Sequence, residues 1–335
     1  MKIQLLINNS KGVFNITPFI TDKITFTTQR KNSASTLDFK FARDLVSQNN
    51  LSIAIDEGNA VELTVNDNKI YKGFVFQKTR SSDQIISIKC YDQLRYLQNK
   101  QSYTFVNKKA SDIIKLISND FGLITGHIQD TGYVLPPLNI DNQRLLDTIM
   151  KVIDLTAYNN GEIYIFYDDI GKLTLRKAKD MYTTYLFTSD VNITNFNYTT
   201  TIDNEVYNQV KLYRDNESTG RREIYLAKDN TNIGNWGVLQ YYEKVDGNFN
   251  EAQAKKLAQD ILALKNRVAE SLSIDIQNVD DNLKLEKLRA GNYVYVLIKA
   301  LSSEDFSKTC LIEKCTHTFS DNEHSIKLEL NGGIQ

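Results

Sequence analysis

Four side chains that suit zinc lie near the end of the sequence: Cys310, Cys315, His317 and His324. Thiolate and imidazole groups are common zinc ligands. Their spacing is not that of a paired-ligand knuckle. Along an extended strand, Cys315 and His317 share one face while Cys310 falls on the other. The pattern favours buried cysteines on a hairpin, with a histidine near its turn, and predicts no metal site.

Two pairs of neighbouring carboxylates are the next candidates, Asp168-Asp169 and Asp280-Asp281. Adjacent residues of a strand point to opposite faces, so neither pair is expected to present both carboxylates to one substrate. Asp168-Asp169 precedes Ile170-Gly171, and this combination is typical of a hairpin turn. We therefore predict that these carboxylates have a structural role.

The sequence contains no GxSxG, HExxH, Walker A or GxGxxG motif. His127 falls in a predicted loop, and loops are mostly exposed, so we expect a surface histidine there. We predict no catalytic, cofactor-binding or metal-binding residue, no cofactor, and a protein that is not an enzyme.

Aromatic residues are a different kind of candidate, because Trp and Tyr are enriched at binding hot spots. Trp236 and Tyr241-Tyr242 stand in the segment NWGVLQYYE. They could anchor an interface, although core packing is the interpretation that we favour.

The composition limits the class of protein. The 335 residues are 41% hydrophobic, which is enough for two or three packed domains. A net charge of −1 argues against a generally basic nucleic-acid binder, and three cysteines cannot form a disulfide framework. We find no signal peptide and no stretch approaching the roughly 18 apolar residues of a membrane span, so we expect synthesis in the cytoplasm.

The elements that must position these residues change in type along the chain. Residues 23–30, 36–43, 60–65, 70–77 and 85–91 alternate or concentrate apolar side chains as strands do. Helical spacing follows Ser111-Asp112 and recurs over 142–157, and a hairpin is expected at 162–176. Asp92 is expected to cap a short helix.

The last part begins with a polar tract at 188–204 and continues mainly as strands, near 208–214, 222–227, 271–277, 293–298, 310–319 and 325–330. The strongest helix signal covers about 250–268, with Asn250 as its expected cap. Whether residues 183–201 form a linker or an edge strand stays open.

Two distant segments resemble each other, residues 74–90 and 312–328. Each follows a Gly-Asn pair, Gly58-Asn59 or Gly291-Asn292, and a strand. Each also contains Ser-Asp, three residues, and Ser-Ile-Lys. Without gaps, Phe74 aligns with Ile312 and Lys89 with Lys327. This echo predicts two similar β domains, one at each end of the chain. Chance remains the alternative.

Several stretches resemble the baseplate hub family of contractile phage tails and phage-tail-like bacteriocins, of the PBSX type (XkdQ/YqbQ-like). They include CYDQLRYLQNKQSYTFVNKKASDIIKLISNDFGL at 90–123, IYIFYDDIGKLTLRKAKDM at 163–181 and NEAQAKKLAQDILALKNR at 250–267. Further stretches begin at 130, 208, 235 and 288, so the resemblance covers most of the chain. It is weaker over 183–201 and 278–287.

The resemblance implies a mainly β fold with an α+β insertion. Two tube-protein-like β-barrel domains, 1–97 and 191–335, would flank a small α+β domain at 98–190. It implies a structural homotrimer that adapts the sixfold tail tube to the threefold spike, assembled into a baseplate and released by lysis. Implied partners are the tube and spike proteins and, further out, the tape measure and wedge proteins. The family gives no catalytic motif to transfer, and DNA would pass its channel only in a true phage.

Two other functions stay open. A tail-associated cell-wall hydrolase would need a nucleophile or metal motif, and a glycan-binding tail module would need exposed Tyr and Trp side chains.

Overall fold

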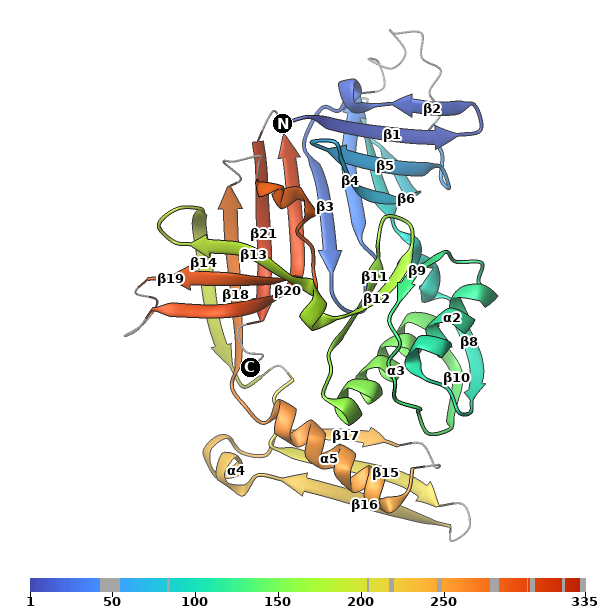
Figure 1. The fold of residues 1–335 in the computed structure, drawn as a ribbon, viewed down its shortest axis with the longest axis vertical. Helices are drawn as coiled ribbons and strands as arrows, with labels where there is room; N and C mark the ends of the chain where they lie inside the picture. Colours follow the sequence, from blue (N-terminus) through green and yellow to red (C-terminus); the bar gives the residue numbers. More distant parts are fainter. Residues whose placement is uncertain are drawn as a thin grey trace.

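The computed structural model describes residues 1–42, 55–82, 85–203, 205–216, 220–245, 249–277, 283–299, 301, 305–320 and 323–331. Most of them form strands, so the mainly β fold predicted from the sequence is confirmed. Figure 1 shows the N-terminal strands in blue beside the C-terminal strands in orange and red, with the helices outside them. Among the described residues, no helix combines the length and hydropathy needed to span a bilayer.

The N-terminal part is a run of antiparallel strands with a short 3₁₀ helix. It comprises β1 (Ile3–Asn9), β2 (Gly12–Asn15), η1 (Thr17–Phe19), β3 (Ile24–Gln29), β4 (Thr36–Ala42), β5 (Ala60–Val65), β6 (Asn68–Arg80) and β7 (Ile85–Tyr91). Alternate residues of these strands are buried, as period-two patterning dictates. Their inward side chains form one hydrophobic cluster.

The C-terminal part repeats this construction. It comprises β13 (Tyr182–Thr188), β14 (Ile193–Thr201), β18 (Ala269–Gln277), η5 (Leu285–Lys287), β19 (Tyr293–Ile298), β20 (Phe306–Ser320) and β21 (Glu323–Asn331). The polar tract is therefore strand rather than linker, and β14 is the outermost strand of its sheet. The inward side chains form a second cluster.

Both parts belong to one 13-stranded sheet. Its main path runs β14-β18-β21-β20-β3-β4-β7-β6-β5-β1-β2, and β19 and β13 branch from β20. The two halves meet where the second half of β20 pairs with β3. Bidentate hydrogen bonds between Arg30 and Glu313 and a hydroxyl contact between Thr27 and Thr316 lie at this junction.

The two halves share strand order and register. The order β3-β4-β7-β6-β5 is matched by β14-β18-β21-β20-β19, with every neighbouring pair antiparallel. A bulge interrupts β6–β7 between Val75 and Gln77, and another interrupts β20–β21 between Ile312 and Lys314. Two strands depart from this match. β13 pairs with β19 in parallel whereas β1 pairs with β5 antiparallel, and β2 has no counterpart among the described C-terminal strands.

The Gly-Asn pairs occupy equivalent positions. The Gly58 and Gly291 amides donate to the carbonyls of Val75 and Ile312, each at 2.8 Å. The amides of Val75 and Ile312 donate back to Asn59 and Asn292, each at 2.9 Å. Both glycines have positive φ, +88° and +94°, which side chains rarely adopt. The echo in the sequence therefore has a structural counterpart.

The gap-free alignment of that echo is nevertheless wrong. Val75, not Phe74, corresponds to Ile312, because these two accept the Gly amide and precede the bulge. Lys89 pairs with Gln77 as Glu329 pairs with Lys314, so Lys89 corresponds to Glu329 rather than Lys327. The equivalence of the two segments is set by the position of the bulge and by the alternation of inward apolar residues, not by identical residue types. Asp83 and Asp321 of the echo lie outside the described residues.

The middle of the chain is an α+β segment. It contains η2 (Gln93–Gln98), β8 (Lys100–Phe105), α2 (Ala110–Asp120), β9 (Thr125–Ile128), β10 (Leu138–Arg144), α3 (Leu145–Asn160), β11 (Tyr164–Asp168), β12 (Leu173–Lys177) and η3 (Ala178–Met181). The 162–176 hairpin and both predicted helices are present. The second helix begins at Leu145 because the preceding residues extend β10.

A further unit lies within the C-terminal region, at the bottom of Figure 1. Its sheet β16-β15-β17 is formed by β15 (Gln209–Asn216), β16 (Arg221–Lys228) and β17 (Gln240–Lys244), with α4 (Asn230–Trp236) and α5 (Glu251–Lys265). Residues of this unit share a hydrophobic cluster with α2 and α3. The predicted 191–335 segment thus contains strands of two separate sheets, a division that local patterning does not reveal.

Candidate functional site

The Cys and His residues lie in the core of the C-terminal half. Cys310, Cys315, His317 and His324 are all at most 2% exposed. Cys310 and Cys315 contribute to the same hydrophobic cluster, so the expectation that they face opposite sides is wrong. The bulge beyond Ile312 adds one residue, and this restores the inward face before Cys315.

Cys315, His317 and His324 are linked by hydrogen bonds, whereas the Cys310 thiol contacts the Lys308 carbonyl. His317 Nε2 donates to the Leu288 carbonyl at 2.7 Å, which leaves Nδ1 of the neutral ring to accept from His324 Nε2 at 2.9 Å. Burial lowers the pKa of His317 to about 4 and that of His324 to about 3, and it raises the pKa of the Cys315 thiol. Uncharged side chains in such a chain support a structural role. Within the described residues, no three His, Cys, Asp or Glu side chains are grouped to hold a metal.

The two residues of the Asp168-Asp169 pair differ in burial, because Asp168 is buried and Asp169 is not. Asp168 Oδ1 accepts the Gly171 amide at 2.5 Å, as turn chemistry predicts, and Oδ2 accepts from Gln93 at 3.1 Å. Asp169 is only half-buried. Asp280-Asp281 lies outside the described residues.

Tertiary structure places a second carboxylate near Asp168. Asp92 caps η2 by accepting the Leu94 amide and also accepts from the Ser35 amide. Burial, with the nearby negative charge of Asp168, raises the pKa of Asp92 to about 7. Burial likewise raises the pKa of Asp168. The sequence identified Asp92 only as a helix cap, because its proximity to Asp168 depends on how β7 and β11 meet.

The remaining candidates lie at the surface or between helices. His127 is exposed in β9, a short strand rather than the predicted loop. Trp236 and Tyr241 are half-buried, and Tyr241 packs against the α2–α3–α5 cluster. Tyr242 is 50% exposed, so core packing does not account for it.

Tyr242 belongs to an exposed face of the sheet β16-β15-β17. It stacks on Tyr213 with ring centroids 4.9 Å apart, and Arg222 lies 4.3 Å from the Tyr213 ring. Ile224 and Leu226, each 54% exposed, extend this face along β16. Apolar and aromatic groups rimmed by charge are typical of interaction surfaces.

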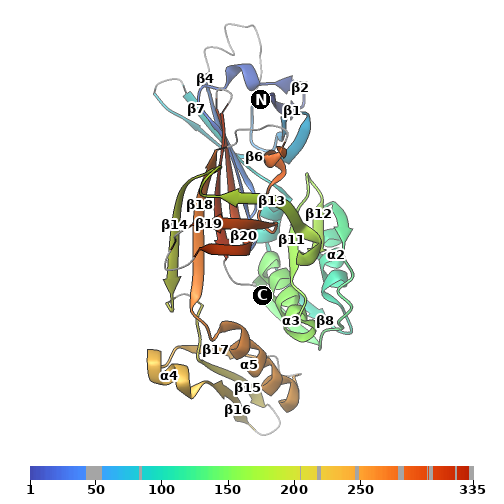
Figure 2. The same ribbon diagram turned by 60° about the vertical axis from the view of Figure 1, so that its left-hand side comes forward.

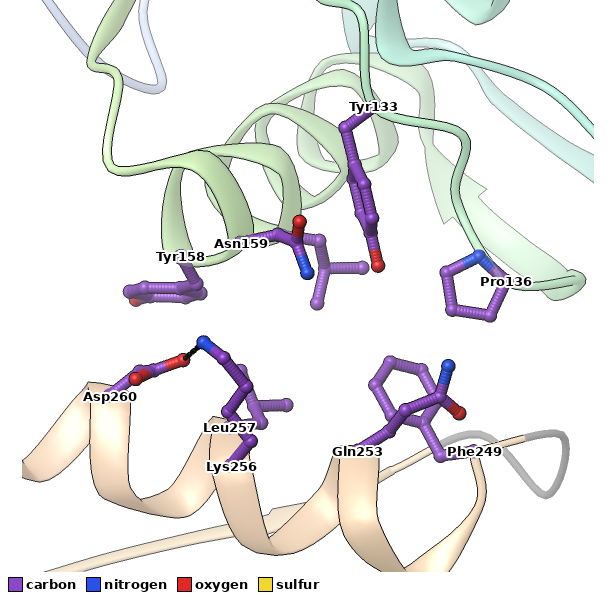
Figure 3. Close-up of a pocket in the computed structure, with 10 residues that line it drawn as sticks. Tyr133, Pro136, Tyr158, Asn159, Phe249, Gln253, Lys256, Leu257 and Asp260 are labelled. Atoms are coloured by element: carbon purple, nitrogen blue, oxygen red, sulfur yellow. Dashed lines mark hydrogen bonds and ion pairs between the residues drawn. The ribbon is translucent and has the colours of Figure 1, made fainter.

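A small pocket lies between α3 and α5 (Figure 3). Its volume is about 60 Å³, far below the roughly 300 Å³ at which small-molecule sites begin. In Figure 3, Tyr133 and Tyr158 face α5 from above, while Lys256 and Asp260 pair with each other along that helix. The pocket is a packing gap between two units rather than a substrate site.

Two strand edges of the large sheet also expose backbone groups. β14 pairs with β18 on one side only, and the described residues place no strand on its other side. β6 pairs with β5 only as far as Phe74, so Gln77–Arg80 has a strand partner on the β7 side alone within the described part of the chain. Both edges therefore leave backbone groups that could pair with an added strand.

Comparison with known proteins agrees with this geometry. The YQBQ-like family model matches residues 24–331. Over 280 residues the chain is 31% identical to protein YqbQ of Bacillus subtilis strain 168, covering 83% of this chain and 82% of that protein. Over 279 residues it is 30% identical to the phage-like element PBSX protein XkdQ of the same strain, with the same coverage.

The fold also resembles that of a solved tail protein. The 43 kDa tail protein of prophage MuSo2 from Shewanella oneidensis superposes with a TM-score of 0.70 at 13% identity, covering 98% of each chain. At 13% identity, this superposition shows a shared fold alone. The family match spans almost all of the described residues, and the chain belongs to the YQBQ-like family.

Proposed function

We propose that this protein is a non-enzymatic structural subunit of a phage-tail-like baseplate, its hub. Three copies would form a ring that presents a sixfold face to the tail tube and a threefold face to the spike. The observation that carries this proposal is the repeated strand order and register of the two halves. A threefold assembly can offer a sixfold face only if each chain supplies two similar surfaces.

The proposal assigns the two halves as tube-protein-like β-barrel domains within 1–97 and 191–335, with the α+β domain at 98–190 between them. The separate sheet β16-β15-β17 and α5 would form an additional unit of the last segment. The sheet β16-β15-β17 lies apart from the large sheet in both ribbon views (Figure 2), and its exposed face with Tyr213 and Tyr242 would suit contact with another baseplate component.

The proposed hub role also implies specific binding partners for this protein. Tube and spike proteins would bind opposite faces of the ring, and tape measure and wedge proteins would contact it further out. The names of a PBSX protein and a prophage tail protein among the similar chains support a place in such a particle. Synthesis in the bacterial cytoplasm and release by lysis would accompany it.

Light scattering on a sizing column, with negative-stain images of the same peak, tests the hub. A mass near three times 38.4 kDa with ring-shaped particles is the expected result. If the isolated chain is monomeric, addition of its cognate tube or spike protein should drive it into rings. A chain that stays monomeric with both proteins present is not a hub.

The hydrolase alternative has its own test. Purified cell walls incubated with the protein should keep their turbidity if the protein is purely structural. Robust clearing that persists after further purification would contradict the non-enzymatic proposal.

A further inference from the structure

We propose that the outer edge of β14 pairs, antiparallel, with the second half of β6 from another copy of this chain. The register would place Thr199 opposite Thr79. This inference rests on the proposed self-assembling ring and specifies the backbone contact that closes it.

The first support is a contact already made inside one chain. The second half of β20 pairs with β3, and the register puts Thr316 opposite Thr27. The two hydroxyl oxygens are 3.2 Å apart. This pairing joins a strand of the C-terminal half to the first strand of the N-terminal order β3-β4-β7-β6-β5.

The second support is the repeat, which assigns each strand its counterpart. β6 corresponds to β20, since Val75 pairs with Cys90 before its bulge as Ile312 pairs with Leu330 before its own. β14 corresponds to β3, the strand at the equivalent end of the order. The counterpart of the β20–β3 contact is therefore β6 with β14.

Within one chain, β6 and β14 cannot make this contact. Strands β18, β21, β20, β3, β4 and β7 separate them along the sheet. The described residues also place no strand on the side of β14, or on that of Gln77–Arg80, where the counterpart pairing would form. A second copy can supply the missing strand, and its own free edges then continue the contact head to tail.

The register transfers residue by residue. Leu37 and Leu272 are equivalent because they pair with Cys90 and Leu330. Phe26 pairs with Leu37 and Tyr198 with Leu272, so Tyr198 corresponds to Phe26. The resulting intermolecular pairs are Gln77–Thr201, Lys78–Thr200, Thr79–Thr199 and Arg80–Tyr198.

The side chains suit these pairs. Thr79 and Thr199 would repeat the hydroxyl contact of Thr316 with Thr27. Arg80 would lie opposite the half-buried Tyr198, where a guanidinium can cover an aromatic ring. Most side chains of β14 are exposed, and an edge strand keeps its backbone groups available for pairing with another chain.

Disulfide trapping tests the register. The Arg30 amide donates to the Glu313 carbonyl, and alternation then makes Thr27–Thr316 a closely spaced, non-hydrogen-bonded pair. Its counterpart Thr79–Thr199 therefore has geometry suited to a disulfide. The double variant Thr79→Cys/Thr199→Cys, treated with oxidised glutathione, should yield intermolecular crosslinks. The native Cys90, Cys310 and Cys315 are buried, which keeps the background low.

The matched control is Thr79→Cys/Thr201→Cys. It also introduces two cysteines, but the second lies two residues away from the position opposite Thr79 in the proposed register. Crosslinks in the first variant and few in the control support the pairing. Rings or trimers by light scattering without selective crosslinking overturn this contact but leave the hub intact. If the isolated chain is monomeric, the oxidation is carried out with the cognate tube and spike proteins present, and absence of crosslinks in the first variant under that condition overturns self-assembly through this edge.

Discussion

At the scale of single residues, the buried polar groups serve packing and connection. His317 lies between Phe26 and Phe319, with ring centroids 5.9 and 5.8 Å away, and it bonds the Leu288 carbonyl. One side chain thus ties β20 to β3 and to the segment before β19. A neutral ring does this without the cost of burying a charge.

Replacement of His317 by Gln should reduce the acid sensitivity of the fold. Burial lowers the folded-state pKa of His317 to about 4, below the unfolded value of roughly 6.5. The contribution of neutral His317 to folding stability is therefore complete above about pH 6.5 and is lost as the pH falls towards 4. Glutamine can still donate to Leu288 but does not titrate. Thermal unfolding between pH 7 and 4 should show a smaller decrease for His317→Gln than for wild type. The exposed His127→Gln is the control, and parallel acid profiles for His317→Gln and wild type would refute this role.

Substitutions at Gly58 and Gly291, the glycines of the two Gly-Asn pairs, can distinguish the cost of backbone strain from the cost of overpacking. At Gly58 a Cβ would meet nothing within 4 Å, whereas at Gly291 it would lie 2.5 Å from Ile165 Cγ2. Gly58→Ala should therefore cost on the order of 1–2 kcal/mol of unfolding free energy from its positive φ. Gly291→Ala should cost a further 1–3 kcal/mol or so from overpacking. Equal losses in urea unfolding would argue against the contact with Ile165.

At the scale of elements, the bulges let one long strand serve two neighbours. β20 pairs with β19 in its first half and with β3 in its second half. β6 pairs with β5 in its first half, and the described residues place no strand on that side of its second half. An extra residue increases the local twist, which turns the strand out of its own layer. Helix ends depend instead on local chemistry, as α5 shows.

Loss of the α5 cap should destabilise that helix measurably. The Asn250 side chain accepts the Gln253 amide at 2.8 Å, and the Gln253 side chain accepts the Asn250 amide at 2.9 Å. Asn250→Ala should lower the unfolding free energy by about 1 kcal/mol. The exposed mid-helix Lys255→Ala should change it by much less. Indistinguishable urea midpoints for the two variants would show that the cap contributes little.

At the scale of the whole molecule, buried charges lie where the parts meet. Asp92 follows β7 of the large sheet and Asp168 ends β11 of the middle segment. Tyr71 of β6 is buried nearby, and Arg289 lies over Tyr167 at 3.9 Å. The positive charge of Arg289 partly offsets the effect of burial on the Asp168 pKa. This junction is therefore sensitive to protonation.

Stability at this junction should fall as pH rises. The folded-state pKa of Asp92, about 7, exceeds the unfolded value of roughly 3.9, so the folded protein holds its proton more tightly and loses stability progressively between those values. Asp92→Asn should give a shallower decline in unfolding free energy from pH 5 to pH 8 than wild type. Exposed Asp67→Asn is the control. A decline as steep in Asp92→Asn as in wild type would contradict the assignment.

The sequence by itself determined most elements and several local roles. Alternation located the strands, Asn250 located the start of α5, and Gly58-Asn59 with Gly291-Asn292 indicated the repeat. These features depend on residues close in sequence, because side-chain period, capping and turn chemistry are local. The family resemblance was likewise visible in short stretches.

Only the tertiary structure decided how these pieces meet. Nothing local shows that β20 pairs with β3, that Asp92 lies near Asp168, or that the sheet of β15 leaves the large sheet. The inward face of both Cys310 and Cys315 likewise required the bulge beyond Ile312. Strands distant in sequence pair in the register that buries the apolar face of each strand. The free energy of this pairing comes from residues hundreds of positions apart, so no local pattern reveals it.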